Sequence, residues 1–130
     1  AIIAGARNTD GPGFFDSRRA LLRGVPPKRL VGGTNTSIGV IATDAILTKA
    51  QASRLATVGH DGFARSINPA HTMLDGDVLF AIATGASGKS LDMMTLAVMA
   101  AEAVAQAVVR GVRAARSVTV GKLTLPAAGG

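Results

Sequence analysis

The sequence predicts an α/β fold, because two short apolar runs alternate with two longer segments of helical periodicity. Residues 37–43 and 77–84 are apolar on both faces, which is typical of buried central strands. Residues 48–67 and 90–115 have the pattern of helices. A chain of 130 residues with 48% hydrophobic residues can form one domain with a real core, which excludes intrinsic disorder.

Residues 1–35 are predicted to be a linker region without a core of their own. Residues 1–6 form a short apolar run that we expect to be a strand, and residues 8–13 are rich in turn-forming Asn, Asp, Gly and Pro. Residues 16–23 can form one or two helical turns, which the prolines that follow would end.

The helix predicted over residues 48–67 begins at Thr48, a residue type that is favoured at the N-cap. Its apolar stripe repeats at helical spacing and consists of Leu55, Val58, Phe63 and Ile67. Pro69 lies just beyond the predicted end of this helix.

The second helix is predicted to have Ser90 as its N-cap and to reach about Ala115. Residues 93–112 are nearly all apolar and would be long enough to span a bilayer. However, a polar edge runs along one face at a spacing of four residues, formed by Glu102, Gln106 and Arg110. We therefore expect a helix that is buried mostly in a soluble core.

The composition excludes several kinds of site. The chain has no cysteine, which excludes disulfides, thiolate metal sites and a cysteine nucleophile. Its two histidines, His60 and His71, are too few for a histidine-rich metal site. Four Phe residues without Tyr or Trp argue against nucleic-acid modules that stack bases.

The net charge of +6 is carried by the two ends of the chain, with +4 in residues 1–35, −1 in residues 36–96 and +3 in residues 97–130. A basic protein can bind nucleic acid or an anionic membrane, but most arginines here are scattered. We therefore predict a solvated surface and neither nucleic acid nor membrane as a partner. Because no signal peptide is recognised, we expect a cytoplasmic protein, and the start without Met suggests a fragment.

A segment of small residues, Gly-Gly-Thr-Asn-Thr-Ser-Ile over residues 32–38, enters the first predicted strand. A hydroxyl at the start of a strand can act as a nucleophile if the chain is cut before it. The freed α-amino group, with an ordinary pKa of about 7.7–8.0, then serves as its base. On these residues alone, a polar turn formed by Asn35, Thr36 and Ser37 is the simpler interpretation.

An acidic pair, Asp75 and Asp77, flanks Gly76 directly before the second strand. Residues two apart on an extended segment point to the same side, so we expect both carboxylates to face one place. Like charges so close together favour a proton on one of them, which suits acid–base catalysis. An exposed Asp-Gly turn is the alternative interpretation.

The two histidines are not predicted to be catalytic. His60 and Asp61 are adjacent on a helix and therefore do not face each other. We interpret His60 as a packing or surface residue and His71 as a loop residue that precedes the acidic pair.

Four blocks of sequence, in register, resemble the DmpA-like peptidases. This family comprises self-processing L-aminopeptidase/D-Ala-esterase/amidases, and the nylon-oligomer hydrolases belong with it. The blocks are residues 35–45 (NTSIGVIATDA), 47–50 (LTKA), 60–65 (HDGFAR) and 71–81 (HTMLDGDVLFA). The resemblance covers about residues 1–110.

In that family a precursor cuts itself before a Thr or Ser, and the new N-terminal residue is the nucleophile. The resemblance implies that Thr36 is the nucleophile, that Asn35 ends the preceding α chain, and that residues 36–130 form the β chain. It assigns Asp75 and Asp77 to the Asp pair of the nylon-oligomer hydrolases, where some aminopeptidase members have Ser and Glu. Further family residues, a Lys or Tyr and an oxyanion-binding Asn, belong to the α chain and match no residue here.

The resemblance also implies a four-layer α/β/β/α sandwich, to which this chain contributes two buried strands and two helices. Residues 1–35 would be the end of the α chain and the linker to the cleavage point. We expect hydrolysis of amides or small peptides through an acyl-enzyme, without a metal or organic cofactor. The partners would be the upstream α chain and, in a homo-oligomer, further αβ units, and the isolated chain would be inactive.

Two other functions are compatible with these features. An acyltransferase like ornithine acetyltransferase would use the same Thr nucleophile to pass an acetyl group to an amine, although the Asp-Gly-Asp block favours the hydrolase. A non-catalytic basic binding or scaffold domain would need no chain break. The intact mass distinguishes them, because autolysis yields two pieces.

Overall fold

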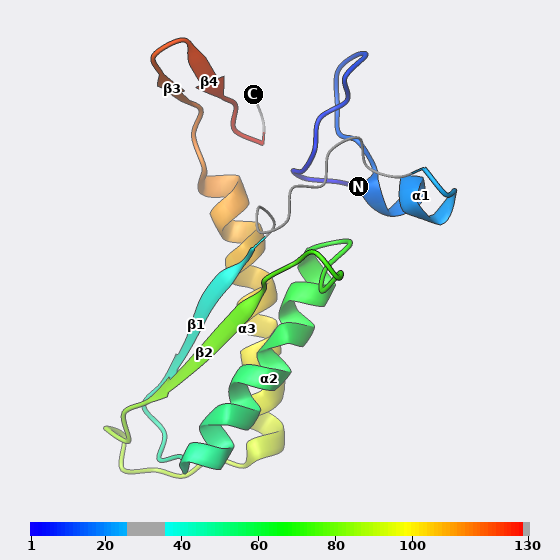
Figure 1. The fold of residues 1–130 in the computed structure, drawn as a ribbon. Coiled ribbons are helices and arrows are strands. Elements are labelled where there is room, and N and C mark those ends of the chain that lie inside the picture. The colour runs from blue at the N-terminus through cyan, green and yellow to red at the C-terminus, as the bar shows by residue number, and fades with distance from the viewer. Residues whose placement is uncertain (26–35, 129–130) are drawn as a thin grey trace. The chain divides into compact units, whose positions relative to one another are not determined.

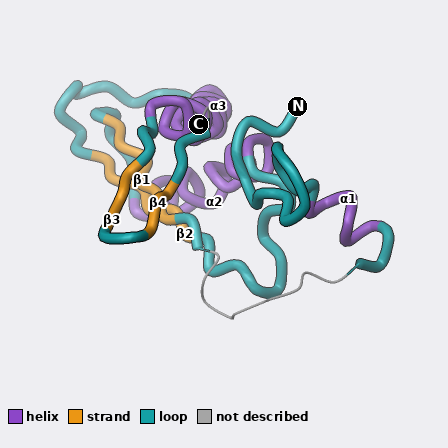
Figure 2. The backbone as a smooth tube through the Cα atoms, turned by 90° about the horizontal axis from the view of Figure 1, so that it is seen from above, coloured by secondary structure: helices purple, strands orange, loops and turns teal. Residues whose placement is uncertain are grey.

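The computed structural model describes residues 1–25 and 36–128, so that Asn35 and the predicted helix end at Pro26 lie outside the described residues. The chain forms two compact units, one of residues 1–29 with 108–130 and one of residues 30–107. The elements, shown in Figures 1 and 2, are α1 (Ser17–Leu22), β1 (Ile38–Thr43), α2 (Lys49–Ser66), β2 (Val78–Ala83), α3 (Met93–Ala114), β3 (Val118–Val120) and β4 (Leu123–Leu125).

The centre of the second unit is a parallel pair of strands, β1 and β2, connected through α2, which confirms the α/β prediction. The register runs from Ile38 opposite Val78 to Thr43 opposite Ala83. Every second residue points to the same face, and one face packs against α2. The core consists of Ile41 and Leu79 from the strands and Leu55 and Phe63 from the helix, together with Ala45, Leu96, Ala100, Ala101 and Val104.

Helix α2 begins as predicted. Thr48 is its N-cap, and its hydroxyl accepts a hydrogen bond from the Gln51 backbone N–H while the Gln51 side chain accepts one from the Thr48 N–H. This reciprocal pair satisfies two donors that the first helical turn leaves without intrahelical partners. The helix ends at Ser66, close to the predicted boundary.

Two buried glycines allow α2 to approach its neighbours closely. A Cβ atom on Gly59 would collide with the Ile41 side chain, and one on Gly62 would lie 2.5 Å from the Ala101 carbonyl oxygen of α3. Helices α2 and α3 accordingly lie side by side in both views (Figures 1 and 2). The position of α2 between β1 and α3 is therefore fixed within narrow limits.

Helix α3 differs from the prediction at its start. Its first turn is capped by Asp92, whose carboxylate accepts a hydrogen bond from the Thr95 N–H at 2.9 Å, so the predicted cap at Ser90 is wrong. By length and composition alone, α3 could cross a membrane. Its polar edge is used within the protein, because Glu102 pairs with Arg65 of α2 at 2.7 Å. Only Leu96, Ala100, Ala101 and Val104 of α3 are buried. The prediction that this helix is mostly buried is therefore wrong for the described chain, in which Met94, Val98 and Met99 are 57–77% exposed.

The first unit contains α1 and a hairpin of β3 and β4. The strand predicted over residues 1–6 is wrong, since the described backbone there forms no strand. Arg7 and Phe14 form a single bridge instead, and the Arg7 guanidinium lies 5.3 Å from the Phe14 ring centre. It also donates a hydrogen bond to the Ala127 carbonyl oxygen at 2.8 Å, which ties the two segments of this unit together.

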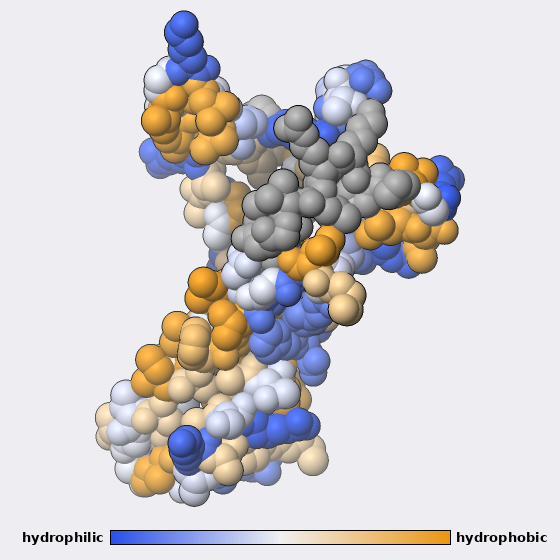
Figure 3. Space-filling view, viewed as in Figure 1, coloured by the Kyte–Doolittle hydropathy of each residue, from blue (hydrophilic) through white to orange (hydrophobic). Residues whose placement is uncertain are grey.

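The outer face of the parallel pair is apolar and exposed. Ile38, Val40, Phe80 and Ile82 project from this face and are 53–70% exposed. Figure 3 shows the resulting apolar surface in orange along the region where the strands face the viewer. Helix α2 covers one face of the strand pair, and the other face, which we expected to be covered by strands from elsewhere, is open in the described chain.

Candidate active site

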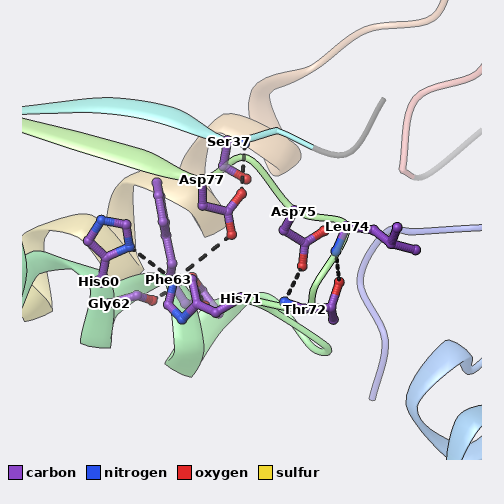
Figure 4. A network of polar contacts seen from close by, with 10 residues as sticks. Ser37, His60, Gly62, Phe63, His71, Thr72, Leu74, Asp75 and Asp77 are labelled. Carbon is purple, nitrogen blue, oxygen red and sulfur yellow. Dashed lines mark hydrogen bonds and ion pairs between the residues drawn. The ribbon is translucent and has the colours of Figure 1, made fainter. Parts of the chain in front are cut away.

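The predicted site residues come together at the amino-terminal ends of β1 and β2. In a parallel pair these ends lie at the same edge, so the segment before β1 meets the segment before β2. The Ser37 N–H donates a hydrogen bond to Asp77 Oδ1 at 2.8 Å, and the Ser37 carbonyl accepts one from the Val78 N–H at 2.9 Å. Figure 4 shows this junction.

The side chain of Thr36 lies against Gly76, between the two aspartates in sequence. A Cβ atom on Gly76 would be only 2.8 Å from Thr36 Oγ1. The absence of a side chain at Gly76 therefore gives the hydroxyl its place beside the backbone of the acidic segment. Thr36 itself is exposed, so a molecule in solution can reach it.

Asp77 is nearly buried, with 6% of its side chain exposed. Its Oδ1 atom is bound by the Ser37 N–H, and its Oδ2 atom lies 3.9 Å from His71 Nε2. A carboxylate with so little exposure needs partners to offset its lost hydration, and these two groups supply them. The Asp77 carboxylate is thereby bound to Ser37, the residue that directly follows Thr36.

Asp75 makes different contacts from Asp77. Its Oδ2 atom accepts a hydrogen bond from the Thr72 N–H at 2.7 Å, and its own N–H donates to the Thr72 carbonyl at 3.1 Å. This pair closes a tight turn directly before the acidic segment. The two carboxylates thus flank Gly76, each with partners of its own (Figure 4).

Both histidines belong to this site, although the sequence interpretation placed neither in it. His71 Nε2 lies 3.0 Å from His60 Nδ1, and the edge of the His60 ring meets Phe63 with the ring planes at 89°. A partial signal is visible in the sequence, because His71 stands six residues before Asp77 in the connection to β2. The contact with His60 depends on how that connection folds back onto α2, which spacing does not reveal.

This edge of the strand pair brings together an exposed hydroxyl at Thr36, a carboxylate bound to the next residue, Ser37, and two imidazoles beyond that carboxylate. A hydroxyl with acid–base groups nearby is the starting point of nucleophilic catalysis. No group of three or more His, Asp or Glu side chains within residues 1–25 and 36–128 is placed to hold a metal ion. Thr36 and Asp77 thus lie at the same edge of the strand pair and are connected through Ser37.

Comparison with known proteins identifies the family. The sequence profile of peptidase family S58 matches residues 6–124. The chain is 64% identical over 52 residues to an uncharacterized aminopeptidase of Mycobacterium tuberculosis, a match covering 40% of this chain and 15% of that protein. It is 56% identical over 59 residues to an uncharacterized aminopeptidase of Mycobacterium leprae, covering 45% of this chain and 16% of the relative.

A third relative carries a more specific name. The chain is 37% identical over 70 residues to a 6-aminohexanoate-oligomer endohydrolase of Agromyces, covering 54% of this chain and 19% of that enzyme. The chain therefore spans less than a quarter of the length of these relatives. The family profile, in contrast, extends over nearly all of it, and on that match this chain belongs to peptidase family S58, the DmpA family.

Proposed function

We propose that the chain is the carboxyl-terminal part of a self-cleaving amidohydrolase, with Thr36 as its N-terminal nucleophile. Residues 1–35 would end the α chain, and residues 36–130 would form the β chain. The observation that carries the proposal is the position of Thr36 Oγ1 against Gly76, in a segment whose next residue, Ser37, binds the carboxylate of Asp77. Membership of a peptidase family supports the hydrolytic chemistry further.

Self-cleavage would begin with attack of Thr36 Oγ on the carbonyl carbon of Asn35. The peptide C–N bond breaks, an ester forms, and the hydroxyl proton passes through a neighbouring carboxylate to the departing amine. Water then hydrolyses the ester, which leaves a carboxylate on Asn35 and a free α-amino group on Thr36.

The mature nucleophile would act on small peptides or amides. Its own α-amino group accepts the proton of the hydroxyl and returns it to the leaving amine, and the acyl-enzyme is then hydrolysed by water. Asp75 and Asp77 would orient the amine and the hydroxyl. This chemistry needs neither a metal nor an organic cofactor, and the hydrolase names of the relatives favour it over acyl transfer.

The upstream α chain is the proposed partner of the exposed sheet face. Ile38, Val40, Phe80 and Ile82 present an apolar surface that an isolated soluble chain would leave in contact with water. A second sheet packed on this face would complete a four-layer α/β/β/α sandwich. The isolated chain would then be inactive, and αβ units would assemble further into a cytoplasmic homo-oligomer.

The proposal is tested on a full-length precursor by intact mass and by sequencing of the new amino terminus. We expect the wild-type protein to split into two pieces, the smaller of which begins at Thr36. Thr36→Ala should remain a single chain and should not hydrolyse aminoacyl amides or 6-aminohexanoate oligomers. Thr36→Ser, which keeps a hydroxyl, should still be cut.

Cleavage of Thr36→Ala at the same bond would disprove the assignment of the nucleophile. A wild-type precursor that stays uncut yet hydrolyses amides would disprove self-processing while leaving the hydrolase intact. Circular dichroism of each variant establishes that the comparison is made between folded proteins.

A further inference from the structure

A continuous row of polar side chains connects Asp77 to helix α2. His71 Nε2 lies 3.9 Å from Asp77 Oδ2 and 3.0 Å from His60 Nδ1 (Figure 4). Asp77 stands directly before β2, His71 lies earlier in the same connection, and His60 belongs to α2. The Asp77 side chain is 6% exposed and the His71 side chain 37% exposed, while His60 at the other end of the row is half-buried.

The backbone holds His71 in an unfavourable conformation. Its φ angle is 55°, in the left-handed region, and it is alone among the described non-glycine residues in having a positive φ. Such a conformation costs roughly 1–3 kcal/mol and persists where the surrounding structure requires it. Here the conformation accompanies an imidazole that lies between Asp77 and His60.

The His60 ring, at the far end of the row from Asp77, is also held in place by its neighbours. Its ring meets Phe63 edge-on, with the ring centres 5.8 Å apart. It stands between Gly59 and Gly62, the residues through which α2 contacts β1 and α3. The position of the His60 ring is therefore set by the packing of the helix, and not by a flexible loop.

The same nitrogen of His71, Nε2, lies near both His60 and Asp77. Its two neighbours together determine whether Nε2 carries the proton of the neutral imidazole. A proton on His71 Nε2 can be donated to His60 Nδ1 and also presents positive charge to the Asp77 carboxylate. In the opposite arrangement, with His60 as the donor, the nitrogen of His71 that lies 3.9 Å from the carboxylate carries no proton, and its partial negative charge repels the carboxylate. An ionised Asp77 therefore selects the arrangement in which His71 is the donor.

We propose that His71, oriented by His60, is a positioning residue for Asp77. The Ser37 N–H binds one carboxylate oxygen at 2.8 Å, and the His71 ring lies 3.9 Å from the other, so that the ring limits how far the carboxylate can turn beside the segment that carries Thr36. The inference rests on the proposed function, in which Asp77 acts together with Thr36. It adds two imidazoles that do not touch the substrate but determine the geometry of a residue that does.

The test uses full-length precursors carrying His71→Asn and His71→Gln. Asn tolerates the left-handed backbone well, but its side chain is too short to place an N–H where Nε2 lies. Gln is long enough to restore that donor. We expect His71→Asn to lower kcat by about tenfold with little change in KM, and His71→Gln to recover most of the loss. Asp61→Asn, an exposed neighbour of His60 on α2, is the control that should match the wild type.

A double-mutant cycle with Asp77→Asn gives an independent readout. If His71 acts through Asp77, replacing it in the Asp77→Asn background should change kcat by less than about twofold. Nitrogen NMR of the folded wild-type protein should find the proton of neutral His71 on Nε2. Additive effects in the cycle, a His71→Gln variant as slow as His71→Asn, or a proton on Nδ1 alone would each overturn the proposal.

These outcomes are separate from those that test the proposed function. A precursor that is cut at Thr36 and hydrolyses amides, but in which His71→Asn behaves like the wild type, refutes the role of His71 only. A precursor in which Thr36→Ala is still cut refutes the proposed function, whatever His71 does. Thermal unfolding of each variant shows whether a loss of turnover accompanies a loss of the fold.

Discussion

The two ends of the parallel strand pair are built differently, although both are polar. At the amino-terminal end, the Asp77 carboxylate accepts a hydrogen bond from the neighbouring segment and contacts His71. At the carboxyl-terminal end, the polar contacts are those of a turn, in which both the backbone N–H and the hydroxyl of Ser87 donate to the Asp44 carbonyl. There, neutral side chains satisfy backbone groups.

The comparison shows which end carries groups that the fold alone does not require. Ligands of open α/β sheets generally bind beyond the carboxyl-terminal ends of the strands. In this chain that end is closed by turn hydrogen bonds, and the nearly buried carboxylate and the two paired histidines lie at the opposite end. A charge that is nearly buried costs stability unless it is well partnered, so its presence at one end only points to chemistry there.

The sharpest test of this contrast exchanges one aspartate at each end. Asp77→Asn should lower turnover by about 100-fold or more, the usual range for loss of an acid–base partner. Asp44→Asn, an exposed aspartate directly after β1, should leave turnover unchanged. Steady-state kinetics of the two variants in the full-length protein measure the difference, and equal effects would break the comparison.

A smaller loss is expected from adding one methyl group at the amino-terminal end. Gly76 does not have a positive φ, so alanine fits its backbone, but the new Cβ atom would lie 2.8 Å from Thr36 Oγ1 and displace it. We expect Gly76→Ala to reduce turnover by about 10- to 100-fold while the protein stays folded.

The matched control for Gly76→Ala is Gly111→Ala, since nothing lies within 4 Å of a Cβ atom at Gly111 of α3. This variant should keep full turnover and gain about 0.5–1 kcal/mol of stability, because alanine is the better helix former. If both glycine variants are fully active, the contact at Thr36 is unimportant.

At the carboxyl-terminal end, a substitution should affect stability and not turnover. Ser87→Ala removes the hydroxyl that donates to the Asp44 carbonyl at 2.8 Å. We expect the free energy of unfolding to fall by about 0.5–1 kcal/mol, as measured by urea denaturation. A change in kcat without a change in stability would assign this end a role in catalysis.

The smallest expected effect is on the pH dependence of stability. It concerns Glu102 of α3, which is not part of either end of the strand pair. Hydrogen bonds from Gln106 and Arg65 hold the pKa of Glu102 below its ordinary value of 4.5. Because the pKa is lowered in the folded state, the stabilisation is present above pH 4.5 and disappears as the pH falls through the folded-state value. Glu102→Gln should therefore flatten the acid side of the stability curve slightly, with turnover unaffected.

Much of the second unit could be predicted from sequence, since its signals are local. The apolar runs located β1 and β2, and Thr48 located the start of α2. The cap of α3 was misplaced because Ser90 and Asp92 are both good N-caps, and the geometry of the first turn decides between them. The hairpin of β3 and β4 was overlooked, although its residues alternate as strands do.

The candidate site was predictable only in part. Sequence and family resemblance pointed to Thr36, Asp75 and Asp77, and the parallel register explains why their segments meet. The pairing of His60 with His71 could not be predicted, since it depends on the left-handed backbone at His71 and on the close approach of α2 to β1. Contacts between segments that are distant in sequence produce no periodic pattern of residues from which they could be predicted.

The backbone of Ser37 makes two hydrogen bonds, and these would limit the motion of a chain end created next to it. A terminus produced by cutting a chain usually frays, because its residues regain conformational entropy. Here the N–H of Ser37 is bound to Asp77 and its carbonyl to Val78 while the chain is still continuous. A terminus created at Thr36 would have one residue beyond this anchor, so that its order would be inherited from the uncut fold and would not have to be regained afterwards.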